Sequence, residues 1–188
     1  MSDLKHFRRI ACLTPAAALR ELEDRPELWD LLTVRQDYEG SAHRDTKTIV
    51  LRGPTTLEGL FDNLEAIDFE LLSQLPATFD LLMRAARAVQ AREVGRAMFV
   101  KLHAGGRITP HTDEGAYARY FARFHVVLTS SSHCWFYAGG ERVNMAPGEL
   151  WWFNHRVEHE VRNGGPERIH LIVDMTAPGY TGALGVPA

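Results

Sequence analysis

Two short stretches of the sequence place a histidine and an aspartate two residues apart. They are His111 and Asp113 in "PHTDEG", and His43 and Asp45 in "AHRD". In an extended strand, positions i and i+2 point to the same face, so each pair could offer an imidazole and a carboxylate to one metal ion. Because the chain holds nine histidines, this spacing also arises by chance. The flanking residues must therefore decide between the two pairs.

The flanking residues favour His111 and Asp113. This pair follows the turn "AGGRITP" between two predicted strands, whereas the other pair lies in the polar connection "EGSAHRDTK", with nothing downstream that completes a site. A third ligand could come from His159 in "VEHEV", which shares its strand face with the two valines. Taken alone, His159 is either a buried core histidine or a ligand. Two histidines and one carboxylate would form the facial triad of non-haem Fe(II) oxygenases.

A competing motif overlaps this last histidine. Residues 155–159, "HRVEH", match the H-x-x-E-H signature of inverted zinc proteases, which needs a helix to bring both histidines to one face. The flanks "GELWWFN" and "EVRNGG" instead alternate in polarity and end in a glycine pair, as strands do. A protease is therefore not expected.

Three further residues carry polar groups into predicted strands. Arg168 opens "RIHLIVDM", and Arg123 and His125 share one face of "RFHVVL". An arginine at a strand end often keeps its head in water. Inside a barrel, however, its planar guanidinium would bind a carboxylate through two hydrogen bonds. Beside iron, the obvious carboxylate is the far end of 2-oxoglutarate, with Arg123 as a second candidate cation.

The elements that would position these residues divide the chain into a helical first half and a strand-rich second half. Thr14 and Pro15 predict the start of a helix, "KTIVLRGP" predicts a strand, and residues 77–94 predict a support helix stopped by Gly95. After Gly95 the apolar period changes from near 3.6 to near 2. Six segments show it: "RAMFVKLHAGG", "RFHVVLTS", "CWFYAGGERVNM", "GELWWFN", "VEHEVRNGG" and "ERIHLIVDM".

These segments predict a fold that is mainly β with N-terminal helices. The expected architecture is a double-stranded β-helix, a cupin-like jelly-roll barrel, because that closure buries both inner faces and hides most strand edges. Length argues for a single domain over 1–188. Within it we expect helical support and an edge strand over 1–95 and the jelly-roll catalytic core over 96–176.

Composition excludes several classes of function. The 188 residues carry a net charge of -3 with a pI near 6.3, which offers no basic surface for a nucleic acid. The first thirty residues lack the apolar core of a signal peptide, and no run approaches a membrane span, so a soluble cytoplasmic protein is expected. The two cysteines are far apart, so neither a disulfide framework nor a cysteine zinc site is predicted.

The second half resembles the aspartyl/asparaginyl β-hydroxylase family of Fe(II)/2-oxoglutarate-dependent dioxygenases, in particular its small bacterial amino-acid hydroxylase branch. The resemblance runs from about residue 98 to 175 and rests on ordered blocks: "PHTD", "RFHVVL", "PGELWWFN", "VEHEV" and "ERIHLIVD". It implies that His111, Asp113 and His159 bind the iron. It also implies that Arg168 holds the far carboxylate of 2-oxoglutarate and that Arg123 and His125 line the co-substrate pocket.

The reaction that the resemblance implies is hydroxylation of an unactivated carbon of an amino acid. Decarboxylation of 2-oxoglutarate to succinate and CO2 accompanies it, and O2 is the oxidant. The family leaves open whether the amino acid is free, peptidyl or bound to a carrier, and Arg44, Arg107 and Arg119 are candidates to hold its carboxylate. The oligomeric state is also open. The alternative function is a cupin-like metal-binding or sensor module without turnover.

Overall fold

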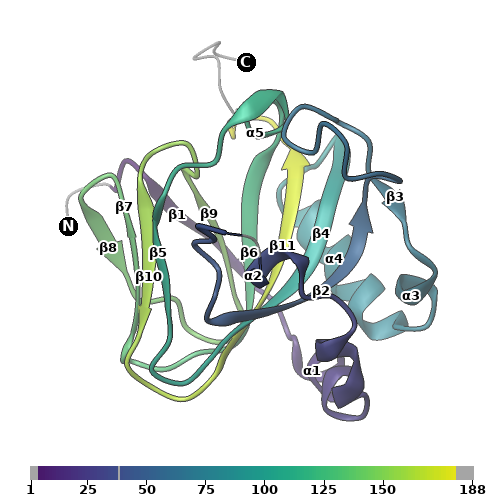
Figure 1. Cartoon of the computed structure of the whole chain (residues 1–188), viewed down its shortest axis with the longest axis horizontal. Coiled ribbons are helices and arrows are strands. Elements are labelled where there is room, and N and C mark those ends of the chain that lie inside the picture. The colour runs from purple at the N-terminus through teal and green to yellow at the C-terminus, as the bar shows by residue number, and fades with distance from the viewer. Residues whose placement is uncertain (1–3, 38, 181–188) are drawn as a thin grey trace.

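Two antiparallel sheets face each other and form the barrel (Figure 1). The structure, a computed structural model, describes residues 4–37 and 39–180. The large sheet consists, in spatial order, of β1 (Phe7–Cys12), β9 (Glu149–Phe153), β6 (Ala122–Thr129), β11 (Arg168–Thr176), β4 (Glu93–Leu102), β2 (Thr46–Gly53) and β3 (Ile67–Asp68). The small sheet consists of β5 (Arg107–His111), β10 (His159–Asn163), β7 (Cys134–Ala138) and β8 (Glu141–Val143).

One layer of helices packs in a buried cluster on the outer face of the large sheet: α1 (Ala16–Glu23), the 3-10 helix η1 (Pro26–Asp30), α3 (Glu70–Ser73) and α4 (Pro76–Ala88). The short helices α2 (Val34–Asp37) and α5 (Gly115–Tyr120) lie outside this layer (Figure 1). Leu22 of α1 and Leu81 of α4 pack in one buried cluster with Phe99 of β4. A second buried cluster, which includes Leu102 and Phe136, fills the space between the sheets. Because the central strands are buried on both faces, they read as nearly continuous apolar runs.

The predicted jelly-roll barrel is confirmed, and the six predicted segments all contain strands. Four strands differ from expectation. β3 was not foreseen, and β5 occupies most of the stretch AGGRITP that was expected to be a turn. β1 was not foreseen, although it pairs with β9 along Phe7–Cys12 through a bulge. β2 was expected at the edge, but β4 and the two-residue β3 pair with its two sides. Short or bulged strands give too little alternation to be recognised from sequence.

Two local expectations were wrong by a few residues. Pro15, not Thr14, occupies the N-cap of α1, and no side chain caps that helix. Gly95 does not stop α4, which ends at Ala88 and leaves through Gln90 at φ 54°. Gly95 lies inside β4, where an added Cβ would come within 2.7 Å of the hydroxyl of Tyr117. Its small size therefore serves close packing rather than helix termination.

Among the residues that the structure describes, none of the helices combines the length and the apolar character needed to cross a bilayer.

Candidate metal and co-substrate site

The register of β5 and β10 brings the distant histidines together. His111 and His159 are direct cross-strand partners, and their ring centroids lie 4.2 Å apart. Asp113 follows two residues after His111, where its N–H donates to the carbonyl of His155 at 3.0 Å. One ligand atom from each of His111, Asp113 and His159 lies within 4.8 Å of the other two. The predicted set is therefore assembled at one point.

Both histidines are oriented by their own backbones. Nδ1 of His111 lies 2.8 Å from the carbonyl of Thr109, and Nδ1 of His159 lies 3.0 Å from the carbonyl of Val157. A carbonyl only accepts, so Nδ1 carries the proton in each ring and Nε2 keeps a free lone pair. Burial is the main cause that lowers the pKa of both rings, that of His159 to about 4, so both are neutral near pH 7. Neutral imidazoles fixed in this way are suited to bind a metal.

The Asp113 carboxylate is held by two donors on one oxygen. Oδ2 accepts from Nη1 of Arg123 at 2.5 Å and lies 3.0 Å from Nδ1 of His155. Oδ1 faces Nε2 of His111 at 3.8 Å. Burial alone would raise the pKa of this carboxyl, but Arg123 and His155 together lower it well below its usual range. Oδ1 is thus an ionised oxygen turned toward the histidines.

Arg123 and His155, which hold Asp113, are each held by a further acceptor. Asp174 accepts from Nε and Nη2 of Arg123 at 2.8 and 3.0 Å, a two-bond pairing with a fully buried carboxylate. Nε2 of His155 lies 3.1 Å from the carbonyl of Phe121. Since both partners of His155 are acceptors, both of its hydrogen bonds form together only when both ring nitrogens carry hydrogen. The Asp113 carboxylate is therefore oriented from two directions, through Arg123 to Asp174 and through His155 to the backbone of Phe121.

Arg168 lies at the other end of the same interior. Its side chain is 1% exposed, and Nη2 donates to Nδ1 of His170 at 2.8 Å. Within the described part of the chain, Nε and Nη1 have no hydrogen-bond partner. Burial lowers the pKa of Arg168 to about 10, so the side chain stays charged at neutral pH. A buried cation with two unused donors is costly unless an anion completes it.

The contact between Arg168 and His170 decides the tautomer of His125. Arginine can only donate, so Nδ1 of His170 is an acceptor, and Nδ1 of His125, 3.0 Å away, must be the donor. Nε2 of His125 then carries a lone pair and, among the described residues, has no partner. Burial first, and Arg168 next, lower the pKa of His125 and His170 well below the usual range. Both rings are therefore neutral near pH 7.

One narrow pocket in the barrel interior is lined by His111 and His159 at one end and by Arg168 at the other. Its lining comes from both sheets and from the segment before β2: Arg35, His43, Val100, Ile108, His111, Arg123, His125, Phe136, Phe153, His159, Val161, Arg168 and Ile172. Five of the six predicted site residues therefore line one pocket. The sixth, Asp113, contacts two of the lining residues, His111 and Arg123. Phe153 also lines this pocket, whereas Trp135, Trp151 and Trp152 do not.

Sequence reasoning missed several members of this site. His43 belongs to the histidine–aspartate pair judged not to bind metal, yet its ring packs edge-on against His111 with centroids 4.9 Å apart. Its neighbour Asp45 instead accepts from the backbone of Arg107 at 2.9 Å. Arg35 and Asp174 lie in no sequence motif that would mark them as site residues. His155 was considered only as part of a protease motif, and residues 155–157 form a turn rather than a helix.

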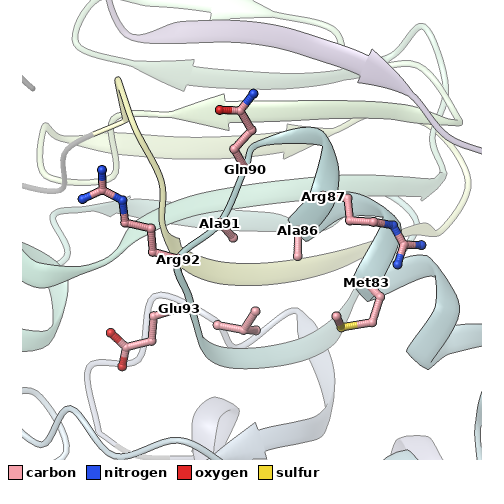
Figure 2. A pocket seen from close by; sticks show the side chains of 8 residues that line it. Met83, Ala86, Arg87, Gln90, Ala91, Arg92 and Glu93 are labelled. Carbon is pink, nitrogen blue, oxygen red and sulfur yellow. The ribbon is translucent and has the colours of Figure 1, made fainter.

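A second, open hollow lies at the end of α4. Figure 2 shows its lining, which comes from one continuous stretch, Met83 to Val94. The charged side chains of Arg87, Arg92 and Glu93 spread apart there instead of converging on a point (Figure 2). Nothing in this arrangement resembles a reaction centre, so the chemistry belongs to the barrel interior.

The sequence profile of the aspartyl/asparaginyl beta-hydroxylases matches residues 39–178, which include every one of the predicted site residues. The chain belongs to this family. The hydroxylase expected from the sequence is thereby confirmed at the level of the family. No curated protein matches the sequence significantly.

Solved structures share the fold of this β-hydroxylase family member at low identity. A 2OG-Fe(II) oxygenase-family oxidoreductase from Burkholderia pseudomallei is 16% identical with a TM-score of 0.56, and covers 97% of this chain and 89% of its own. A Pseudomonas putida prolyl-4-hydroxylase is 16% identical with a TM-score of 0.51, covering 93% and 95%. A prolyl hydroxylase from Trichoplax adhaerens, solved with a hypoxia inducible factor peptide, is 14% identical with a TM-score of 0.56, covering 93% and 85%.

Proposed function

We propose that this protein is an Fe(II)/2-oxoglutarate-dependent hydroxylase acting on an unactivated carbon of an amino acid. In this proposal His111, Asp113 and His159 bind the iron, and Arg168 binds the far carboxylate of 2-oxoglutarate. The co-substrate is decarboxylated to succinate and CO2, and O2 is the oxidant. The proposal covers one domain, in which residues 96–176 supply the catalytic core and 1–95 support it.

The donor set supports iron. Two neutral imidazoles on neighbouring strands and one carboxylate from the loop after β5 match the donor set of the facial triad of non-haem Fe(II) oxygenases. Each ligand is turned by a second contact: the two histidines by their backbone carbonyls, and Asp113 by Arg123. The bound iron would supply oxygen activation. The chain's own residues fix its geometry and keep the pocket dry.

One observation carries the assignment of the co-substrate. Arg168 is fully buried, has two donors without a partner among the described residues, and lines the same pocket as His111 and His159. A planar fork of donors matches a carboxylate, and a dicarboxylate with an oxo-acid end would reach the metal with its other end. Apolar side chains between the two ends, Val100, Phe136 and Ile172, exclude water around it.

The test separates co-substrate binding from metal binding. Without oxygen, Fe(II) and 2-oxoglutarate should give the weak visible absorption band of their complex in the wild-type protein. Arg168→Ala should keep Fe(II) binding and raise the dissociation constant of 2-oxoglutarate by about two to four powers of ten, since a buried charge loses its partner. Arg168→Lys should recover part of the loss, because an ammonium is a point charge where a fork is needed.

The control ligand is 2-oxobutyrate, which lacks the far carboxylate. It should bind wild type and Arg168→Ala nearly equally. Normal 2-oxoglutarate affinity in a folded Arg168→Ala variant would contradict the assignment. Tight zinc binding without the absorption band or succinate formation would instead favour a metal-binding module without turnover.

A further inference from the structure

Arg168, His170 and His125 form a chain of polar side chains inside the barrel. Arg168 and Ile172 line the pocket, and His170 lies between them on β11 and shares their face, because alternate residues of a strand point the same way. Ile172 is the cross-strand partner of His125 on β6, so His125 and His170 are diagonal neighbours. Their rings meet edge-on, with centroids 5.3 Å apart. The register of β6 and β11 therefore brings the three side chains together.

His170 is the acceptor at the centre of this chain. Nη2 of Arg168 donates to Nδ1 of His170 at 2.8 Å, and Nδ1 of His125 lies 3.0 Å from the same atom. Burial first, and Arg168 next, lower the pKa of His170 well below its usual range, so the ring is neutral and its one hydrogen is on Nε2. His170 therefore accepts from Arg168 at neutral pH.

The chain is unfavourable for stability alone. Four of its atoms are buried without a hydrogen-bond partner in the described ranges 4–37 and 39–180: Nε and Nη1 of Arg168, Nε2 of His125 and Nε2 of His170. Apolar side chains of similar size would avoid the free-energy cost of these unpaired groups. Sites that break such rules are expected to be functional. A role in binding therefore explains the chain better than packing does.

The contact with His170 fixes the direction of the Arg168 guanidinium. Among the residues that the structure describes, it is the only hydrogen bond that the Arg168 side chain makes, and the nearest ring face, that of Phe136, lies 5.9 Å from Cζ. Once Nη2 is held, the plane of the guanidinium and the positions of Nε and Nη1 are set before a ligand arrives. Without this acceptor the planar group could rotate about its side-chain bonds.

Other arginines do not replace Arg168 at this end of the pocket. Arg123 donates to Asp113 and Asp174. The arginines considered from sequence for the substrate are exposed and do not line the pocket: Arg44, Arg107 and Arg119. How an anion is held beside β11 therefore depends on the orientation of Arg168.

We infer that His170 is a positioning residue for the co-substrate: by accepting from Nη2 of Arg168, it directs the other donors of that guanidinium and so sets the preference for an acid with a far carboxylate. The inference rests on the proposed function and deepens it. His170 is not part of the pocket lining, so it acts through Arg168 and not on the co-substrate itself. Asparagine could replace it, because its side-chain oxygen is an acceptor near the place of Nδ1, whereas leucine could not.

The first arm of the test uses the wild-type protein, so it does not depend on the folding of any variant. The histidines of the Zn(II)-loaded protein are labelled with an NMR-active nitrogen isotope, and their spectra show which ring nitrogen carries hydrogen. We expect hydrogen on Nε2 of His170 and on Nδ1 of His125, and no change in His170 when 2-oxoglutarate binds. Hydrogen on Nδ1 of His170, with or without 2-oxoglutarate, would overturn the inference because that atom could not accept from Arg168.

The second arm measures binding of 2-oxoglutarate and 2-oxobutyrate to Zn(II)-loaded variants by calorimetry. His170→Leu should raise the dissociation constant of 2-oxoglutarate by about 10-fold and leave that of 2-oxobutyrate nearly unchanged, because only the first acid has a far carboxylate. His170→Asn should recover most of the loss. A folded His170→Leu variant with the wild-type preference overturns the inference, and so does a loss in His170→Asn that equals the loss in His170→Leu.

Val127→Ala is the matched control for packing. Val127 is buried and is the cross-strand partner of His170 on β6, but it does not line the pocket. The variant removes buried bulk beside His170 without removing the acceptor, so it should keep the wild-type preference for 2-oxoglutarate over 2-oxobutyrate. If Val127→Ala lost that preference as His170→Leu does, packing and not the acceptor would be responsible.

Failure of the inference and failure of the proposed function are distinguishable. If Arg168→Ala binds 2-oxoglutarate normally, the co-substrate site of the proposed function is contradicted. If Arg168→Ala loses affinity while His170→Leu keeps the wild-type preference, only the role of His170 is contradicted.

Discussion

Arg123 donates from Nη1 to Oδ2 of Asp113 at 2.5 Å, while its other edge is paired with Asp174. The family resemblance suggested that this arginine would line the co-substrate pocket, and it does lie in the lining. Its donors, however, go to two carboxylates. The charge of Arg123 therefore keeps Asp113 ionised and directs Oδ1 toward the histidines. Its role as a direct co-substrate contact stays a prediction.

Asp174→Asn tests whether the relay from Asp174 through Arg123 to Asp113 orients the carboxylate of Asp113. The change removes the charge that partners the buried Arg123, and breaking a buried pair costs about 3–5 kcal/mol, so the urea midpoint of unfolding should fall sharply. Fe(II) affinity should fall by about 10–100-fold, because Asp113 is less well oriented. Asp30→Asn, in an exposed pair with Lys47, is the control and should leave both unchanged. Equal midpoints for the two variants would show that the relay does not stabilise the fold.

Metal removal gives a second prediction. Adding Fe(II) or Zn(II) at about 100 times its dissociation constant should stabilise the wild-type protein by about 2.7 kcal/mol, and a chelator should reverse the rise in Tm. His111→Ala and His159→Ala should lose this metal-dependent increment because each removes one ligand. A full increment in either variant would contradict the proposed ligand set.

Stability should depend on pH through the buried His170. Its folded-state pKa lies well below 6.5, so between the two values the unfolded chain binds a proton that the folded chain does not. Stability is therefore fully present above about pH 6.5 and falls as the pH drops, with a slope of up to about 1.4 kcal/mol per pH unit from this group. Urea midpoints of the metal-free protein between pH 8 and 5 should fall less steeply in His170→Gln. If the urea midpoints of wild type and His170→Gln fell in parallel with pH, His170 would not be the source of the pH dependence.

The turn after Asp113 depends on Gly115. This residue has φ +89°, and an added Cβ would come within 2.3 Å of the carbonyl of Phe61. Gly140→Ala is the matched control, because Gly140 has φ +84° but nothing within 4 Å of the new Cβ. Both variants should lose about 1–2 kcal/mol to backbone strain, and Gly115→Ala about 1–3 kcal/mol more to overpacking. Thermal unfolding of the pair isolates the steric part, which vanishes if the two variants have the same Tm.

The sequence by itself determined the class of fold and named most residues of the candidate site. Strand alternation and helix periodicity are local properties, so the change of period near Gly95 was enough to predict a jelly roll carried by helices. The pair best suited to bind metal, His111 with Asp113, was recognisable because residues two apart share a face in extended backbone and because the flanking segments have the pattern of strands. His159 and Arg168 were candidates from their strand positions, and the ordered family blocks then selected them.

Only the tertiary structure decided which groups meet. The register of β5 and β10 places His159 opposite His111, and a slip of one residue would turn it to the other face. The pairing of Arg123 with Asp174 depends on the register of β6 and β11, and the contact of His43 with His111 depends on how a connecting segment closes the barrel. Such contacts join residues far apart in the chain. Because strand alternation and motif spacing describe only near neighbours, they do not specify these contacts, and packing of the whole chain does.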